Sequence, residues 1–195
     1  MNLDFADGTE GVTRGDDDDA TQNVSRLCSV SSFSRWDAAP VCGERNHCRE
    51  DIHRLVGEYF EAYNVRFTLS RPSPSEIFTT VIVAPPVAEC TFGHRGIAFA
   101  DCGDANPRSV AFVFDCGGDA ASCAVLVAHE TAHTFGLVHS LDSDDIMTPA
   151  PEEPVLRFRA ASSPTAANEC GVLMQSSHEA LLAVLGPRKR RAHSD

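Results

Sequence analysis

The sequence predicts a single α+β domain, and three observations lead to that prediction. The chain has 195 residues, of which 43% are apolar, so it can form one core but is too short for two full domains. A helical pattern over residues 44–63 precedes strand patterns at residues 77–84 and 110–114. A second helical pattern then leads into HETAHTFGLVHS, residues 129–140. Helix, strands and helix in this order indicate a sheet covered by helices.

The two ends of the chain differ in composition from its centre. Residues 1–23 include four consecutive aspartates and few apolar residues, so we expect an acidic, flexible and solvated tail. Calcium binding by the aspartates is the weaker interpretation, because an unbroken run lacks the spaced ligands and turning glycine of a calcium loop. Residues 24–186 are expected to form the domain, and residues 187–195 a basic tail.

Each expected element follows from a local pattern. In the first helix apolar residues recur at three- and four-residue spacing, whereas the strands alternate or are wholly apolar. The expected elements are strand 24–33, helix 44–63, strands 65–69, 77–84, 96–100 and 110–114, a helix from about residue 122, and a closing helix 176–185.

The second helix carries the residues that point to chemistry. His129 and His133 are four residues apart, which places both imidazoles on one helical face, close enough to share a metal ion. Gly136 follows where the helix must end, because glycine enters the left-handed conformation at little cost. The resulting turn is expected to return His139 to the same metal.

Three imidazole ligands with a fourth position open to water are typical of a catalytic zinc site, whereas structural zinc sites usually have four protein ligands. Glu130 directly follows the first ligand and is therefore a candidate general base. The short pattern HExxH also arises by chance on amphipathic helices. The added Gly136 and His139 make the longer motif far more specific.

HETAHTFGLVHS followed by DSDDIMTP resembles the metzincin clan of zinc metalloproteases. Ser140 after the third histidine, and Thr148 after Met147, are similar to matrixins within that clan. The resemblance implies a metzincin-like α+β catalytic domain with a twisted, mostly parallel sheet, an antiparallel edge strand, an active-site helix, a Met-turn and a C-terminal helix. It also implies that Met147 forms an apolar floor beneath the zinc. The structural-zinc and calcium segments of vertebrate matrixins have no counterpart here, so one zinc ion is expected and calcium is unsupported.

The resemblance further implies an endopeptidase whose extended protein or peptide substrate pairs with the edge strand. The expected substrate-binding residues are Gly96, Ile97, Ala98, Phe99 and Ala100. In this mechanism Glu130 accepts the proton of a zinc-activated water. The alternatives are a latent or non-catalytic zinc-containing binding module and a highly specific maturation protease.

Composition indicates where such a protein would work. Eight cysteines favour disulfides in an oxidising compartment, with Cys116–Cys123 and Cys90–Cys102 as candidate local pairs and Cys42 as half of another. Residues 1–20 lack an apolar leader, so we expect a secreted protein whose leader has been removed, the alternative being a chain that is not exported. The net charge of −12 argues against nucleic acid and anionic membranes as partners. With no apolar run long enough to span a bilayer, a soluble monomer is expected.

Overall fold

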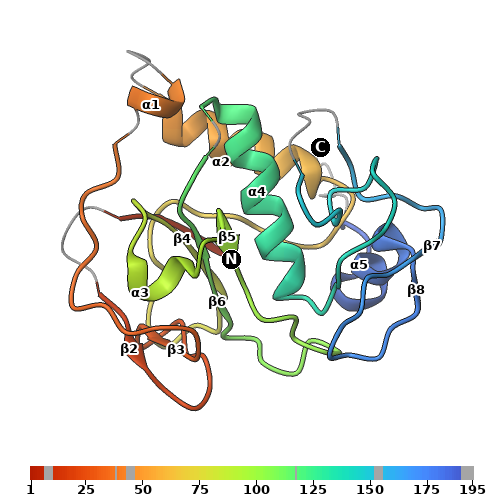
Figure 1. Ribbon diagram of the computed structural model, residues 1–195, viewed down its shortest axis with the longest axis horizontal. Coiled ribbons are helices and arrows are strands. Elements are labelled where there is room, and N and C mark those ends of the chain that lie inside the picture. Colours follow the sequence, from red (N-terminus) through yellow and green to blue (C-terminus); the bar gives the residue numbers. More distant parts are fainter. Residues whose placement is uncertain (7–10, 38, 43–46, 117, 152–155, 190–195) are drawn as a thin grey trace, which may run out of the picture.

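A four-stranded sheet with the order β1-β4-β6-β5 forms the centre of the computed structural model (Figure 1). β1 (Asn2–Phe5), β4 (Thr80–Val83) and β6 (Val110–Val113) are parallel, and β5 (Gly96–Ile97) pairs antiparallel with β6 at one edge. The prediction of a mostly parallel sheet with an antiparallel edge strand is confirmed. The structure describes residues 1–6, 11–37, 39–42, 47–116, 118–151 and 156–189.

One face of the sheet packs against two helices, α2 (Cys48–Tyr59) and α4 (Ala120–His133), which also contact each other. Alternate strand residues, including Val81 and Val113, point toward these helices and are fully buried. In Figure 1, α4 crosses the strands near the middle of the molecule. The larger core of the protein therefore lies directly beneath the helix that carries HExxH.

The opposite face packs against the chain before α2. Ile82 and Phe112 point this way and share a second core with Phe33. This chain segment contains a small parallel pair, β2 (Thr13–Arg14) and β3 (Val24–Ser25). Both faces of the central strands are thus covered, which explains why those strands are apolar in sequence except at Thr80.

The remaining elements are short, and most lie beyond α4 in the chain. They are α1 (Ala39–Cys42), α3 (Ala88–Thr91), the antiparallel pair β7 (Ser163–Pro164) and β8 (Met174–Gln175), and α5 (Ser177–Leu185). None of the helices in the described part of the chain has the length and apolar character needed to span a membrane.

The prediction of a flexible acidic tail over residues 1–23 is wrong at β1 and at Asp18. β1 lies in the sheet beside β4, and its Leu3 is fully buried. Asp18 is 5% exposed, and its carboxylate accepts hydrogen bonds from the backbone N–H groups of Arg26 (2.7 Å) and Val110 (3.3 Å). Because these donors satisfy the carboxylate, an acidic segment can be buried against the sheet.

Three expected strands are much shorter or differently formed than predicted. Of the expected strand 96–100, only Gly96–Ile97 is a strand. Only Val24–Ser25 of the expected strand 24–33 is a strand, and residues 65–69 contribute a single bridge between Thr68 and Asn2. Of the predicted basic tail, Arg188 donates a backbone hydrogen bond to the carbonyl of Ala62 at 2.9 Å, while residues 190–195 lie outside the described residues. The expected start of the first helix at residues 44–46 also lies outside them.

All eight cysteines form disulfides: Cys28–Cys90, Cys42–Cys48, Cys102–Cys170 and Cys116–Cys123. The predicted pair Cys116–Cys123 and the predicted involvement of Cys42 are confirmed. The predicted pair Cys90–Cys102 is wrong, because Cys90 is buried in the core beneath the second sheet face, whereas Cys102 reaches the loop before β8. Four disulfides suggest an extracellular or otherwise oxidising environment.

Candidate metal centre

Helix α4 places the first two candidate ligands. Its N-cap is Asp119, whose carboxylate accepts hydrogen bonds from the backbone N–H groups of Ala121 and Ser122 at 2.8 and 2.9 Å. The helix then runs through the core to its last residue, His133. The Nε2 atoms of His129 and His133 are 3.1 Å apart, so the predicted shared helical face is confirmed.

A tight turn after α4 brings in the third histidine. Gly136 has a φ of +88°, and a Cβ placed on it would lie 2.7 Å from the carbonyl oxygen of Asp101. Both the conformation and the lack of space therefore require glycine. The Nε2 atom of His139 lies 3.2 Å from that of His129, and the ligand atoms of all three histidines lie within 4.8 Å of one another.

Backbone carbonyls fix the proton positions of two of these rings. The Nδ1 atoms of His129 and His133 lie 2.7 Å from the carbonyl oxygens of Ile146 and Leu137, respectively. A carbonyl oxygen only accepts hydrogen bonds, so each Nδ1 must carry the proton and each neutral Nε2 must present a lone pair. Two lone pairs cannot form a hydrogen bond across 3.1 Å, whereas a cation between them would satisfy both.

The electrostatic environment keeps the imidazoles neutral. Burial lowers the pKa of His129 well below its ordinary value and that of His133 to about 4. Burial also lowers the pKa of His139, and the electrostatic effect of the nearby His94 is a second, smaller cause. Neutral imidazole is the form that binds metals, so at neutral pH this cluster offers three donor nitrogens.

Glu130 lies beside the histidines and is 5% exposed. Burial raises the pKa of Glu130 well above its ordinary value. Its side chain packs against β5, because a Cβ placed on Gly96 would lie 2.5 Å from Oε1 of Glu130. The predicted general base and the predicted edge strand are therefore in direct contact.

A cavity of about 260 Å³ adjoins the histidines, and its lining includes His94, Arg95, Gly96, Leu126, His129, Glu130, His139 and Pro149. Among the predicted substrate-binding residues, Gly96 lines this cavity. Ile97 continues β5, and Phe99 lies under the guanidinium of Arg26 at 4.0 Å. Ala98 packs against the larger core, and Ala100 accepts a hydrogen bond from the backbone of Cys102. A substrate role for all five residues stays a prediction.

Met147 is fully buried, and its carbonyl accepts a hydrogen bond from the backbone of Ser140 at 2.8 Å. The preceding residue, Ile146, accepts the hydrogen bond from His129. The segment that contains Met147 is thus tied to two ligand-bearing parts of the chain. The floor role of Met147 beneath a metal stays a prediction.

Two further residues at this centre carry no sequence signal. Gln175 and Asp145 are 6% and 1% exposed. The side chain of Gln175 hydrogen-bonds to the backbone of Val138, next to His139, and that of Asp145 to the backbone N–H of Met147, next to Ile146. Buried glutamine and aspartate side chains are recognisable only once their partners are known, and Gln175 is 37 residues from its partner Val138. Sequence spacing alone could not have identified either residue.

No protein-family model matches the chain, and a search of curated proteins found no match. The assignment of the site therefore depends on its geometry. Among the described residues, His129, His133 and His139 are the one group of His, Cys, Asp or Glu side chains that could hold a metal ion.

Proposed function

We propose that the protein is a secreted, zinc-dependent endopeptidase of the metzincin type. The observation that carries this proposal is the convergence of three Nε2 atoms beside the buried carboxylate of Glu130, along one cavity. The donors are all neutral imidazoles, which suit zinc and other late first-row metals better than calcium or magnesium.

Two of the three nitrogen separations are compatible with a zinc site. Zinc–nitrogen bonds of about 2.0–2.1 Å in a tetrahedral site correspond to nitrogen atoms roughly 3.3 Å apart. The separations of 3.1 Å between His129 and His133 and 3.2 Å between His129 and His139 are close to that value. Three protein ligands also leave a fourth position for water or substrate, as catalytic zinc sites do.

A zinc ion held by the three histidines would polarise the scissile carbonyl and make water more acidic. Glu130 is placed to accept the proton of the attacking water and to return it to the leaving amine. Burial raises the pKa of Glu130, so its carboxyl group binds a proton more tightly than an exposed glutamate does.

The substrate would bind along β5. Among the strands of the described residues, β5 pairs with β6 alone, so its other edge can accept an extended peptide through main-chain hydrogen bonds. Gly96 of β5 contacts Glu130, and therefore a peptide paired there would lie next to the general base. Strand pairing recognises backbone groups, which would let the enzyme bind many different sequences.

The test combines zinc content per chain with cleavage of a quenched fluorescent peptide library, before and after treatment with a chelator. We expect one zinc per chain, loss of cleavage on chelation, and recovery when zinc is returned. Glu130→Gln should retain zinc but lower kcat roughly 10²- to 10⁴-fold, because a general base is lost. His133→Ala should lose both zinc and activity.

Other outcomes would favour the alternative functions. Near-normal cleavage by Glu130→Gln would remove Glu130 as the base. One zinc without cleavage of the library would favour a non-catalytic binding module, a latent enzyme or a narrowly specific maturation protease. A panel of folded protein substrates would then separate a specific protease from the other two.

A further inference from the structure

The side chain of Gln175 holds the chain segment that delivers the third histidine. Its Oε1 atom accepts a hydrogen bond from the backbone N–H of Val138 at 3.0 Å, and its Nε2 atom donates to the carbonyl of Val138 at 2.8 Å. Val138 immediately precedes His139. A side-chain amide that pairs with both backbone groups of one residue restrains that residue in the way a neighbouring strand would.

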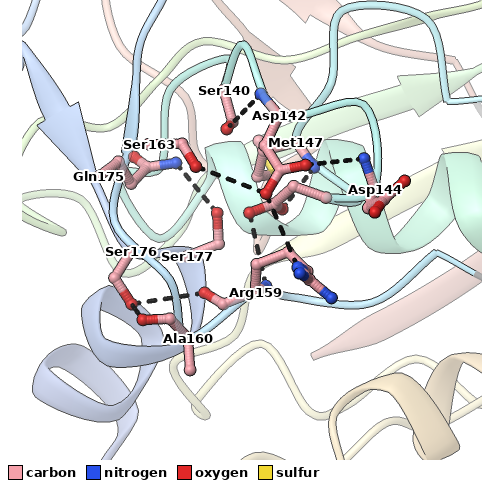
Figure 2. Close-up of polar contacts among 11 residues, drawn as sticks. Ser140, Asp142, Asp144, Met147, Arg159, Ala160, Ser163, Gln175, Ser176 and Ser177 are labelled. Carbon is pink, nitrogen blue, oxygen red and sulfur yellow. Dashed lines mark hydrogen bonds and ion pairs between the residues drawn. The ribbon is translucent and has the colours of Figure 1, made fainter.

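The second N–H of the same amide points to the side chain of Ser177 (Figure 2). Nε2 of Gln175 donates to the hydroxyl of Ser177 at 3.2 Å, and that hydroxyl donates to the carboxylate of Asp145. Ser177 is fully buried, and Asp145 is 1% exposed. One N–H of the Gln175 amide therefore binds Val138, while the bonds through Ser177 lead toward the carboxylate of Asp145.

At the other end, Asp145 orders the segment that orients the first histidine. Its Oδ1 atom accepts a hydrogen bond from the backbone of Met147 at 2.9 Å, and Oδ2 accepts one from the backbone of Arg159 at 3.4 Å. Ile146, between Asp145 and Met147, provides the carbonyl that binds Nδ1 of His129. The chain of side chains thus ends at Asp145, which directly precedes the residue whose carbonyl sets the proton position of His129.

We propose that Gln175, Ser177 and Asp145 form a positioning relay that sets the metal affinity of the histidine cluster. One end restrains the backbone next to His139, and the other restrains the carbonyl that orients His129. Outer residues that orient metal ligands typically contribute 10- to 100-fold to metal affinity. The relay rests on the metal-binding part of the proposed function and does not require peptidase activity.

Two variants break the relay at different points. Ser177→Ala removes the link between Gln175 and Asp145 but leaves both bonds to Val138 in place. Gln175→Met has a similar length and loses the bonds to Val138 as well. The matched control is Thr80→Val, because the buried hydroxyl of Thr80 accepts a hydrogen bond from Asn2 at 3.2 Å in the sheet, away from the histidines.

The measurement is the zinc affinity of the full-length, metal-free protein, determined by competition with a chromophoric chelator. The visible spectrum of the cobalt-substituted protein reports ligand geometry independently. We expect zinc affinity to fall 10- to 100-fold in both relay variants, with a changed cobalt spectrum. Thr80→Val should keep the affinity and spectrum of the unaltered protein even if its melting temperature falls.

Zinc affinity within about twofold of normal in Ser177→Ala and Gln175→Met, with unchanged spectra, would overturn the relay. An equal loss of affinity in Thr80→Val would also overturn it, because the effect would then be one of general stability. If Gln175→Met does not fold, Ser177→Ala decides the question. Zinc binding by the unaltered protein without cleavage of any peptide or folded protein substrate would reject the endopeptidase but leave the relay fully testable.

Discussion

The carboxylate of Glu130 packs directly against the backbone of Gly96, the first residue of the edge strand. A Cβ placed on Gly96 would lie 2.5 Å from Oε1 and 2.8 Å from Cγ of Glu130, both far inside normal contact distance. Gly96 does not have a positive φ angle, so glycine is required here only because a larger side chain would not fit. This contact fixes the distance between the proposed base and the strand expected to bind substrate.

Gly96→Ala should therefore disable the proposed enzyme while leaving the metal site in place. The new methyl group must displace Glu130 or move β5, and a displacement of about 1 Å at a catalytic group can cost on the order of 100-fold in rate. The measurement is kcat on a peptide substrate alongside zinc content. Gly57→Ala is the control, since a Cβ there meets nothing within 4 Å. Unchanged kcat in Gly96→Ala would contradict the proposed roles of this contact.

The N-terminal strand should be essential for stability. Leu3 is fully buried within the larger core, so Leu3→Ala should lower the free energy of unfolding by about 2–5 kcal/mol. Chemical denaturation of the two proteins measures the difference. Asp16→Asn, at an exposed position outside the core, should change it by no more than about 0.5 kcal/mol. Equal stability of Leu3→Ala and the unaltered protein would mean that β1 is not part of the folded core.

Local patterns predicted the elements around the histidines well. The spacing of His129, His133 and Gly136 depends only on helix geometry and on the conformational freedom of glycine, so the sequence alone was enough to group the ligands. The apolar run at residues 110–114 likewise indicated a central strand, which the structure contains as Val110–Val113. Both predictions rest on interactions within a few residues of the chain.

The errors arose where distant parts of the chain meet. The acidic composition of residues 1–23 hid the short apolar strand at Leu3, because its sheet partner lies 78 residues away. The Cys102–Cys170 bond, with a separation of 68 residues, depends on how two loops pack and not on local spacing. The contact between Gln175 and Val138 could not be predicted for the same reason, because the two residues lie 37 positions apart in the chain. These contacts exist only in the folded protein.

The Cys102–Cys170 disulfide should be the first to yield to a mild thiol reductant. Cys102 is exposed and Cys170 is half-buried, whereas each of the other six cysteines is at most 8% exposed. Access of the attacking thiolate limits the rate of exchange. Brief reduction, alkylation and mass spectrometry of the native protein should show modification at these two residues first. Earlier labelling of Cys42 or Cys48 would contradict this order.

Loss of that disulfide should also weaken the metal centre. The loop that carries Cys170 follows Ala166, whose backbone N–H donates to the carbonyl of His139 at 3.0 Å. At the other end of the bond, Asp101 beside Cys102 donates its backbone N–H to the carbonyl of His133 at 2.9 Å. Replacing both cysteines by serine should therefore lower zinc affinity in a competition assay. An unchanged affinity would mean that the two loops hold their places without the bond.

Acidification should destabilise the metal-free protein through His133. Burial lowers the pKa of His133 from 6.5 to about 4, so the unfolded chain takes up this proton first as the pH falls. Its contribution to stability is fully present above pH 6.5 and is lost as the pH falls toward 4. The difference of about 2.5 pKa units corresponds to roughly 3 kcal/mol.

Burial of Glu130 acts in the opposite direction, because its raised pKa makes the folded state bind the proton more tightly than the unfolded state does. The contribution of His133 must therefore be isolated by comparing the metal-free protein with metal-free His133→Asn, in which Glu130 is retained. Between pH 6.5 and 4, the free energy of unfolding should fall more steeply in the unaltered protein than in the variant. Parallel curves would show that His133 is protonated equally easily in the folded and unfolded states, and hence that it is not held neutral for a metal.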